Sequence, residues 1–589
     1  MNEMSNDPEN VVPAEESEGV SRRKFIGRLG ATVGALSVAP LVGGMESKVE
    51  AAPGNGNLNG SSAATGRMNQ CFAYRRDAAI ASRVNGPSQS GNGDIARYSD
   101  YSGIYSKGLL HDSLGIPNAA AAAGLIKAFQ TGKQSDFSSI LVGTPGGGRN
   151  SKLNGPQGAL AFDLQGIDSH STVIPAAPAV ASAHTAAEEV EHYWGAILRD
   201  VPFADFGTSP LVAQACADMN SLSYVSGPEN DQIPYPVTPQ NLFRGQIVEG
   251  DGNVQGPYVS QFMVQPTFYG SQFLDQKHRT FMPGQEFMTS VATYQSIQNG
   301  GPDEAAIVID PTRRYLRSGR DLAAYTQVDV LFQAYFTAFM IMAGIGAAPN
   351  PGVPYIGSQT QKAFGTLGGP DAAGTLCEMA TRALKASWYH KWIKDLGMRP
   401  EEYGVLVHAR KTNANPMPQA ATDLHNDVLN SAALPIIHAA HGTYLLPQPF
   451  PEGAPTHPCY PTGHGTVGGA CITALKFFFD GGQQIRPLLT AAGRDIYEPS
   501  SDGLTLNTYG GADANVIDLN GELNKLAWNV TVGHGIHAGI HFRSSSYWSI
   551  LLGEQVALAV LRDRAKSYNE PFTITITKFD GTPATITNQ

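Results

Sequence analysis

Apolar residues recur at helical spacing along most of the second half of the chain and at one place in the first half. In residues 185–198, Trp194 and Leu198 fall on one helical face, and Thr185 with Glu188 forms a capping box at the start. The same pattern predicts further helices at about residues 371–396, 419–442, 464–480, 520–541 and 546–566. Helices therefore dominate, and no alternation of strands with helices indicates a parallel sheet.

The longest apolar run, residues 331–348, approaches the length of a membrane span. Gln333, Tyr335 and Thr337 interrupt it, so we interpret it as a buried core helix. Residues 572–589 instead alternate apolar and polar positions around an Asp-Gly turn, which is typical of a β-hairpin. We expect an all-α fold with long loops and a small C-terminal hairpin.

The N-terminal residues have a different character. The stretch SRRKFIG precedes a modest apolar run, which predicts a twin-arginine export signal over residues 1–51. Such a chain would be bacterial, would be periplasmic or secreted, and would keep no membrane span after removal of the signal. We predict an extended surface segment over residues 52–115, an N-terminal helical half at 116–370 and a C-terminal helical half at 371–589.

Composition and charge exclude some classes of protein. Of the 589 residues, 42% are hydrophobic, which excludes a disordered chain. Residues 1–51 hold five Lys or Arg and eight Asp or Glu, so the remainder carries a net charge of −8, which argues against a nucleic-acid partner. The five cysteines are scattered and odd in number, and they indicate neither a zinc site nor a disulfide framework, although one bridge is possible.

Three polar islands stand out in the helical, apolar second half. Each contains residues that bind anions or transfer protons. The islands contain Lys391 and Arg399; Thr462, Gly463 and His464; and His534, His537 and His541.

The first two islands have the chemistry of an oxyanion site. The planar guanidinium of Arg399 matches a tetrahedral oxyanion, and Lys391 adds positive charge. Gly463 lets an anion approach the backbone amides at a helix N-terminus, and Thr462 adds a hydroxyl. Taken singly, each island also has a plainer interpretation: a solvated Lys-Arg face, or an ordinary helix cap. Together they predict a phosphate-like oxyanion site with histidines available for attack, ligation or proton transfer.

The third island allows a second interpretation. His534, His537 and His541 fall at positions i, i+3 and i+7, along one face of a continuous helix. Three imidazoles in a row can hold zinc, copper or nickel. The alternative is one functional histidine with two neighbours that pack or form hydrogen bonds.

The order of these motifs resembles that of the vanadium-dependent haloperoxidases, which share their architecture with the type 2 phosphatidic acid phosphatases and the bacterial acid phosphatases. The resemblance rests on Lys-x7-Arg-Pro, on HPCYPTGHGT and on a Gly-x-His near the C-terminus, and it is closest to the bromoperoxidase-like branch. It extends through EEVEHYWGAILRDVPF, ELNKLAWNV and LLGEQVALAVLRD, and so covers most of the chain. It implies two packed four-helix bundles with the site among helices of the C-terminal half.

The resemblance also implies roles for individual residues around vanadate. It assigns His541 as the axial ligand to vanadium and His464 as the acid/base near the apical oxygen. It implies that Lys391 also acts in catalysis. The implied vanadate-binding set is Lys391, Arg399, Thr462, Gly463 and His541. His457 matches a histidine that supports the site from behind.

Several positions depart from the family pattern. Gly535 stands where the family has a third arginine, and one inserted residue would bring His534 to that position as a replacement, protonated mainly below about pH 6.5. Ser545 stands where the family often has an aspartate that orients the axial histidine. Thr462 replaces the commoner serine and keeps the hydroxyl. His390 lies where the red-algal enzymes carry an arginine linked to halide choice.

The leading functional hypothesis is an exported vanadate-dependent haloperoxidase. It would use hydrogen peroxide to oxidise a halide, bromide or iodide rather than chloride, to a hypohalous species that halogenates an organic acceptor. The first alternative is an acid phosphatase that binds phosphate in the same pocket and uses His541 as nucleophile. The second is a family member without vanadate, acting as a binding protein or an acid/base catalyst. We expect a homodimer or a higher homo-oligomer.

Overall fold

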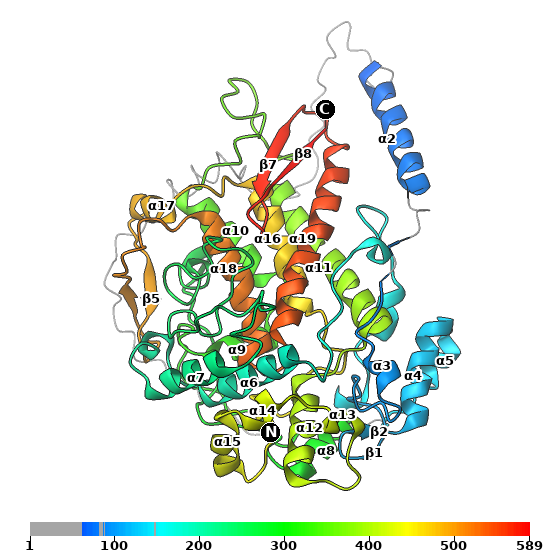
Figure 1. The fold of residues 1–589 in the computed structure, drawn as a ribbon. Coiled ribbons are helices and arrows are strands. Elements are labelled where there is room, and N and C mark those ends of the chain that lie inside the picture. The colour runs from blue at the N-terminus through cyan, green and yellow to red at the C-terminus, as the bar shows by residue number, and fades with distance from the viewer. Residues whose placement is uncertain (1–61, 82–85, 88, 146–148, 589) are drawn as a thin grey trace, which may run out of the picture.

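The computed structural model describes residues 62–81, 86–87, 89–145 and 149–588, and in these it is rich in helix (Figure 1). The predicted export signal, residues 1–51, lies outside the described residues. The strands form four two-stranded antiparallel pairs. The pairs are β1 (His111–Ser113) with β2 (Ile116–Pro117), β3 (Thr267–Tyr269) with β4 (Gln272–Leu274), β5 (Tyr497–Pro499) with β6 (Leu506–Thr508), and β7 (Thr573–Thr577) with β8 (Pro583–Thr587). The predicted all-α class and the C-terminal hairpin are confirmed.

The longest helices pack around α16 (Gly463–Phe478), which is buried along nearly its whole length. Its neighbours are α10 (Gln333–Ile345), α11 (Gly369–Tyr389), α18 (Leu519–Val532) and α19 (Arg543–Ala565). The contact with α19 is close because glycines lie in it: a Cβ added at Gly465 would fall 2.0 Å from Ser549 Oγ, and one added at Gly553 would fall 2.0 Å from the Thr466 carbonyl oxygen. This packing fixes the first turn of α16 against the start of α19.

A second group packs around α6 (Ala183–Ile197), and its helices are shorter. It contains α7 (Pro210–Ser221), α12 (Pro400–Thr412), α14 (Asn426–Asn430) and α15 (Ala433–His441). Two groups of helices accord with the implied pair of bundles, but α10 and α12 each pack with helices from the other side of residue 370. The division at that residue therefore stays a prediction about folding units.

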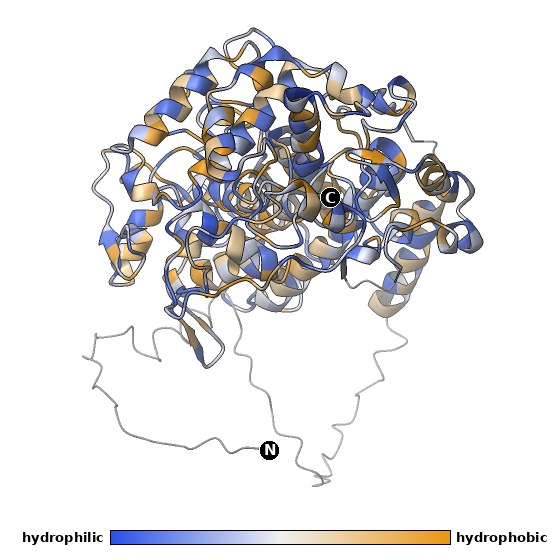
Figure 2. Ribbon diagram, turned by 90° about the horizontal axis from the view of Figure 1, so that it is seen from below, coloured by the Kyte–Doolittle hydropathy of each residue, from blue (hydrophilic) through white to orange (hydrophobic). Residues whose placement is uncertain are grey.

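One further helix, α9 (Gly319–Val328), is mostly buried and packs against the Gly533–His537 turn and α18. The remaining helices are α2 (Ser62–Ala81), α3 (Asp94–Arg97), α4 (Ala119–Thr131), α5 (Gln134–Ser138), α8 (Val291–Gln298), α13 (Gln419–Thr422) and α17 (Ile485–Ala491). Figure 2 shows that most outer helices carry hydrophilic and hydrophobic residues side by side, as one-sided burial requires.

Four predicted elements differ from the structure. Residues 62–81 form a helix within the segment predicted to be extended, because they include six Ala and three Arg, which favour helix. The predicted 419–442 helix is three short helices, since Pro435 lacks an N–H and is accommodated in the first turn of α15. The helices predicted to end at 396 and 541 both pass into π turns, at His390–Asp395 and at Gly533–His537.

Other predictions are confirmed or corrected more simply. Residues 331–348 contain the buried helix α10. No single described helix is long and apolar enough to cross a membrane; α9 and α10 pass that test only as a pair, which is bent by 102°. All five cysteines are free, so the possible disulfide does not form in this structure.

Candidate oxyanion site

Lys391 lies in the π turn that follows α11, and its side chain is fully buried. Its Nζ donates to the carbonyl oxygens of Pro458 and Cys459 at 2.8 and 2.7 Å. The turn closes at Leu396, which has a left-handed backbone (φ 50°). Single π turns often occur at functional sites, because they rotate side chains away from the regular helical positions. Here the turn places the Lys391 ammonium against the backbone of Pro458 and Cys459, just before the second polar island.

Arg399 precedes α12 as its N-cap, and its backbone N–H donates to Glu402 Oε2 at 2.6 Å. The guanidinium is fully buried and joins His457, which precedes the second island, to the third island. Nε donates to the His457 carbonyl oxygen at 2.9 Å, and Nη1 donates to the Ile540 carbonyl oxygen at 3.0 Å. Nη1 also lies 3.0 Å from His541 Nε2.

In the part of the chain that the structure describes, neither Lys391 nor Arg399 has an anionic side-chain partner. Among the described residues, the side chains of Lys391 and Arg399 meet carbonyl oxygens and imidazoles but form no ion pair with Asp or Glu. Burial, and then the charge of Arg399, lower the pKa of Lys391 well below its ordinary value, and burial lowers the pKa of Arg399 as well. Two adjacent buried cations without counter-charge are costly unless an anion joins them. The structure therefore supplies an anion site at this place.

The second island begins α16. Thr462 is the N-cap, yet its side chain makes no capping hydrogen bond, and its buried Oγ1 has no hydrogen-bond partner in the described structure. Gly463 is the first helical residue, and a Cβ there would contact Leu384 and Trp388 at 3.3 and 3.4 Å. A free hydroxyl and the N-terminal amides of a long helix are donors for an anion.

His464 points toward Asp329, which sequence reasoning missed. His464 Nε2 lies 3.1 Å from Asp329 Oδ1, and the two side chains are 11% and 3% exposed. Asp329 directly follows α9, and its Oδ2 has no hydrogen-bond partner among the described residues. No motif marks Asp329, because it lies 135 residues from His464 and shares no local pattern with it.

The hydrogen bonds around His541 define which ring nitrogen carries the proton. The Ser545 hydroxyl donates to the Cys459 carbonyl oxygen at 3.1 Å, and the Cys459 thiol donates to the Ile540 carbonyl oxygen at 3.8 Å. Both groups therefore turn lone pairs to His541 Nδ1, at 3.3 and 3.4 Å. A proton on Nδ1 satisfies both of these contacts and leaves the Nε2 lone pair toward Arg399 Nη1, which is nearer to Nε2 (3.0 Å) than to Nδ1 (3.4 Å).

The His541 imidazole is neutral in this surrounding. Burial, and then Arg399 and Lys391, lower the pKa of His541 well below its ordinary value. A neutral ring with a free Nε2 lone pair is the form that ligates a metal. Ser545 thus holds His541 as the expected aspartate would, without adding a buried charge.

His534 lies between two of the expected site histidines. Its ring centroid is 4.1 Å from that of His464 and 5.6 Å from that of His541, and its buried Nδ1 has no hydrogen-bond partner among the described residues. Position 535 has no room for a side chain: a Cβ there would fall 2.9 Å from Ser546 Oγ and 3.1 Å from the His541 carbonyl oxygen.

The expected charge on His534 needs correction. Burial, followed by His464, lowers its pKa well below the ordinary value, so this surrounding favours the neutral ring. The role of His534 as a replacement for the third arginine stays a prediction, now with a neutral group.

The predicted row of three metal-binding histidines does not form. The π turn at Gly533–His537 rotates His537 away from the site, to a position where its Nε2 lies 3.0 Å from Tyr258 Oη. Gly539, with φ +67°, then ends the helical path before His541. No group of three or more His, Cys, Asp or Glu that could hold a metal ion occurs among the described residues.

The two supporting histidines have different positions. His457 Nδ1 lies 2.9 Å from Arg399 Nη2, and its ring packs on Trp388 with centroids 4.7 Å apart, so it supports the arginine. His390 is buried, but its Nε2 lies 2.8 Å from Thr172 Oγ1. That contact turns His390 to the loop around residue 172 and not to Lys391.

Together, the fold and the site define a class of protein: a helical enzyme with a buried, cationic oxyanion site. Comparison with known proteins gives the family. The chain is 32% identical over 532 residues to the vanadium-dependent bromoperoxidase of Ascophyllum nodosum, covering 86% of this chain and 91% of that protein. It is 30% identical over 551 residues to that of Corallina officinalis, covering 81% and 90%. The chain belongs to the vanadium-dependent bromoperoxidase family.

A solved structure agrees with this assignment. The homohexameric second vanadate-dependent bromoperoxidase of Ascophyllum nodosum superposes with a TM-score of 0.80 at 27% identity, covering 94% of this chain and 96% of that one. No family model matches the sequence.

Proposed function

We propose that this protein is a vanadate-dependent bromoperoxidase that uses hydrogen peroxide to oxidise bromide. One observation carries the proposal: among the described residues, Lys391 and Arg399 are buried together without a carboxylate partner, and the buried Thr462 hydroxyl at the start of α16 has no hydrogen-bond partner. Vanadate is an oxyanion that such donors stabilise. The relatives, all named vanadium-dependent bromoperoxidases, support the same cofactor and reaction.

The residues present fit vanadate. Lys391 and Arg399 would neutralise its oxygens, and the Thr462 hydroxyl with the Gly463 amide would add neutral donors. His541 would ligate through Nε2, whose lone pair is kept free by the proton on Nδ1. His534 would add one neutral hydrogen bond.

Bound vanadate supplies a Lewis acid that activates hydrogen peroxide toward halide. The protein positions the reactants and moves protons. Asp329 holds His464 through Nε2, which leaves Nδ1 of that ring to exchange a proton with a reacting oxygen. Lys391 and Arg399 offset negative charge in a site from which they exclude water, since both are fully buried.

The halide, the compartment and the assembly follow from other observations. Bromide is proposed because the relatives are named bromoperoxidases. Periplasmic or secreted localisation is proposed from the twin-arginine pattern in residues 1–51. A homo-oligomer is proposed because the superposed structure is a homohexamer. The phosphatase and vanadate-free hypotheses are not needed to explain the site.

The test is a calorimetric titration of the purified protein with orthovanadate, followed by hydrogen peroxide, bromide and a phenolic dye. We expect saturable vanadate binding and bromination that rises with site occupancy. Absence of vanadate binding would contradict the proposed cofactor, and binding without bromination would contradict the proposed reaction.

A further inference from the structure

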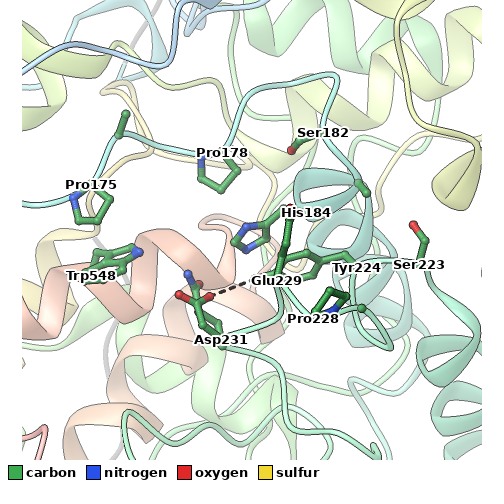
Figure 3. Close-up of a pocket in the computed structure, with 14 residues that line it drawn as sticks. Pro175, Pro178, Ser182, His184, Ser223, Tyr224, Pro228, Glu229, Asp231 and Trp548 are labelled. Carbon is green, nitrogen blue, oxygen red and sulfur yellow. Dashed lines mark hydrogen bonds between the residues drawn. The ribbon is translucent and has the colours of Figure 1, made fainter.

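A second cavity opens on the surface at the start of α6, apart from the oxyanion site (Figure 3). Its volume is about 670 Å³, which lies in the range of small-molecule sites. Three segments far apart in sequence form its walls: the loop before α6, the loop after α7, and the first turns of α19.

Aromatic rings form two of these walls. His184 and Tyr224 stack with centroids 3.9 Å apart and an interplanar angle of 12°. Trp548 of α19 lies on the other side of the hollow (Figure 3). Pro175, Pro178 and Pro228 add apolar surface. A flat apolar body would fit between such surfaces.

The polar groups in the cavity are negative. Asp231 and Glu229 line it, and among the described lining residues none is Lys or Arg. The Tyr224 hydroxyl donates to Asp231 Oδ1 at 3.2 Å, which fixes this carboxylate beside the stacked rings. Burial, followed by the carboxylates of Glu188 and Asp231, raises the pKa of Tyr224 above its usual range. An anion would be repelled here, and a cation would be attracted.

We propose that this cavity binds a small organic cation with a flat apolar body, namely a protonated arylalkylamine. The ammonium group pairs with Asp231 and Glu229, and the ring lies between Trp548 and the His184–Tyr224 stack. Aromatic faces also attract cations, so both halves of the ligand are recognised by the same walls.

This site is separate from the oxyanion site, and the two are connected only indirectly, through Glu188 and the start of α19. No lining residue hydrogen-bonds to Lys391, Arg399 or His541 in the described structure. However, His184 Nε2 lies 3.5 Å from Glu188 Oε1, and Glu188 accepts hydrogen bonds from the backbone N–H and the hydroxyl of Ser544. The proposed binding does not require vanadate, so it stands independently of the proposed function.

The experiment is calorimetric titration of the full chain with 2-phenylethylamine, which is a cation near neutral pH, and with 2-phenylethanol as its neutral counterpart. We expect one saturable amine site per chain and at least about tenfold weaker binding of the alcohol. Equal affinity for the two probes, or no binding of the amine, would overturn the proposal.

Variants test the location. Asp231→Asn combined with Glu229→Gln, and separately Trp548→Ala, are expected to weaken amine binding by about tenfold or more. Glu249→Gln removes an exposed carboxylate outside the cavity and should leave it unchanged. Lys391→Met, which alters the oxyanion site, should also leave amine binding unchanged. Unaltered affinity in the cavity variants, with thermal unfolding showing that they are folded, would refute the assignment.

Discussion

His464 and Asp329 form a half-buried pair, with 3.1 Å between Nε2 and Oδ1, that links the start of α16 to the residue following α9. The carboxylate fixes one ring nitrogen and orients the other. The other Asp329 oxygen has no hydrogen-bond partner in the described structure, so the ring is its principal contact. Asp329 therefore acts through His464 as a positioning residue.

Replacing Asp329 by Asn is expected to lower kcat by about tenfold or more, because general acid–base catalysis contributes two to four decades and needs a correctly held imidazole. Vanadate affinity should change less than about threefold, since Asp329 contacts no anion-binding group. Steady-state bromination and calorimetry check both statements. Asp112→Asn, an exposed change of the same type, is the control, and a large loss of vanadate affinity with unchanged kcat would contradict the assignment.

Lys391→Met should weaken vanadate binding by about thirtyfold or more, since loss of a buried, hydrogen-bonded cation from a charge pair costs roughly 2–5 kcal/mol. The same change should not lower the thermal stability of the vanadate-free protein, because it removes a buried charge that has no ion pair. Calorimetry and thermal unfolding give the two readouts. Lys362→Met, at an exposed position, serves as control; unchanged vanadate affinity in K391M would exclude Lys391 from the site.

Much of this site follows from sequence, because each island carries its chemistry locally. A glycine and a hydroxyl residue that open an apolar helix predict anion donors wherever the helix lies, and α16 begins at Gly463 as expected. The parts that failed depend on distant contacts. Asp329 meets His464 only because α9 packs against the Gly533–His537 turn and α18, and α18 in turn lies beside α16. The π turn that removes His537 from the row has no signature in residue spacing.

The fold likewise divides into parts that the local sequence predicts and parts that it does not. Helical periodicity located α6, α11, α16, α18 and α19, since each buries a continuous apolar face. It failed at residues 419–442, where apolar spacing continues but Pro435 and the caps at His425 and Ser431 divide the segment. Local polar groups there satisfied the backbone in place of a longer helix.

Ser545→Ala is expected to weaken vanadate binding by roughly fivefold to thirtyfold, because His541 Nδ1 loses the hydroxyl that accepts its hydrogen bond, and one hydrogen bond is worth about 1–2 kcal/mol. Ser545→Thr keeps the hydroxyl and should retain most of the affinity. Calorimetry measures both, and nitrogen-15 NMR of labelled histidine reports the tautomer directly. Equal affinities in the two variants would contradict the proposed role.

His534→Gln should cost less than the loss of Lys391. The ring is neutral, because burial and His464 lower its pKa, so it can offer a bound anion a single hydrogen bond. We expect a loss of about fivefold in vanadate affinity at neutral pH, against thirtyfold for the lysine variant. A loss in His534→Gln that equals or exceeds that of Lys391→Met would show that His534 binds as a cation after all.

The pH dependence of stability should contain a contribution from His390. Burial, and then Lys394, lower its pKa from 6.5 to about 4, so the unfolded chain takes up a proton more readily than the folded one. The stabilisation is fully present above about pH 6.5 and is lost as the pH falls toward 4. The whole effect is worth up to about 3 kcal/mol.

His390→Gln removes this titration while keeping a polar atom near Thr172 Oγ1. The free energy of unfolding, measured by denaturant titration from about pH 7.5 to 4, should therefore fall less steeply in the variant than in the unaltered protein. Thr172→Val is the matched control, because it removes the hydrogen bond and retains the imidazole: it should lower stability at every pH and keep a steep acid limb. Parallel pH profiles for His390→Gln and the unaltered protein would show that His390 is protonated equally in the folded and unfolded states.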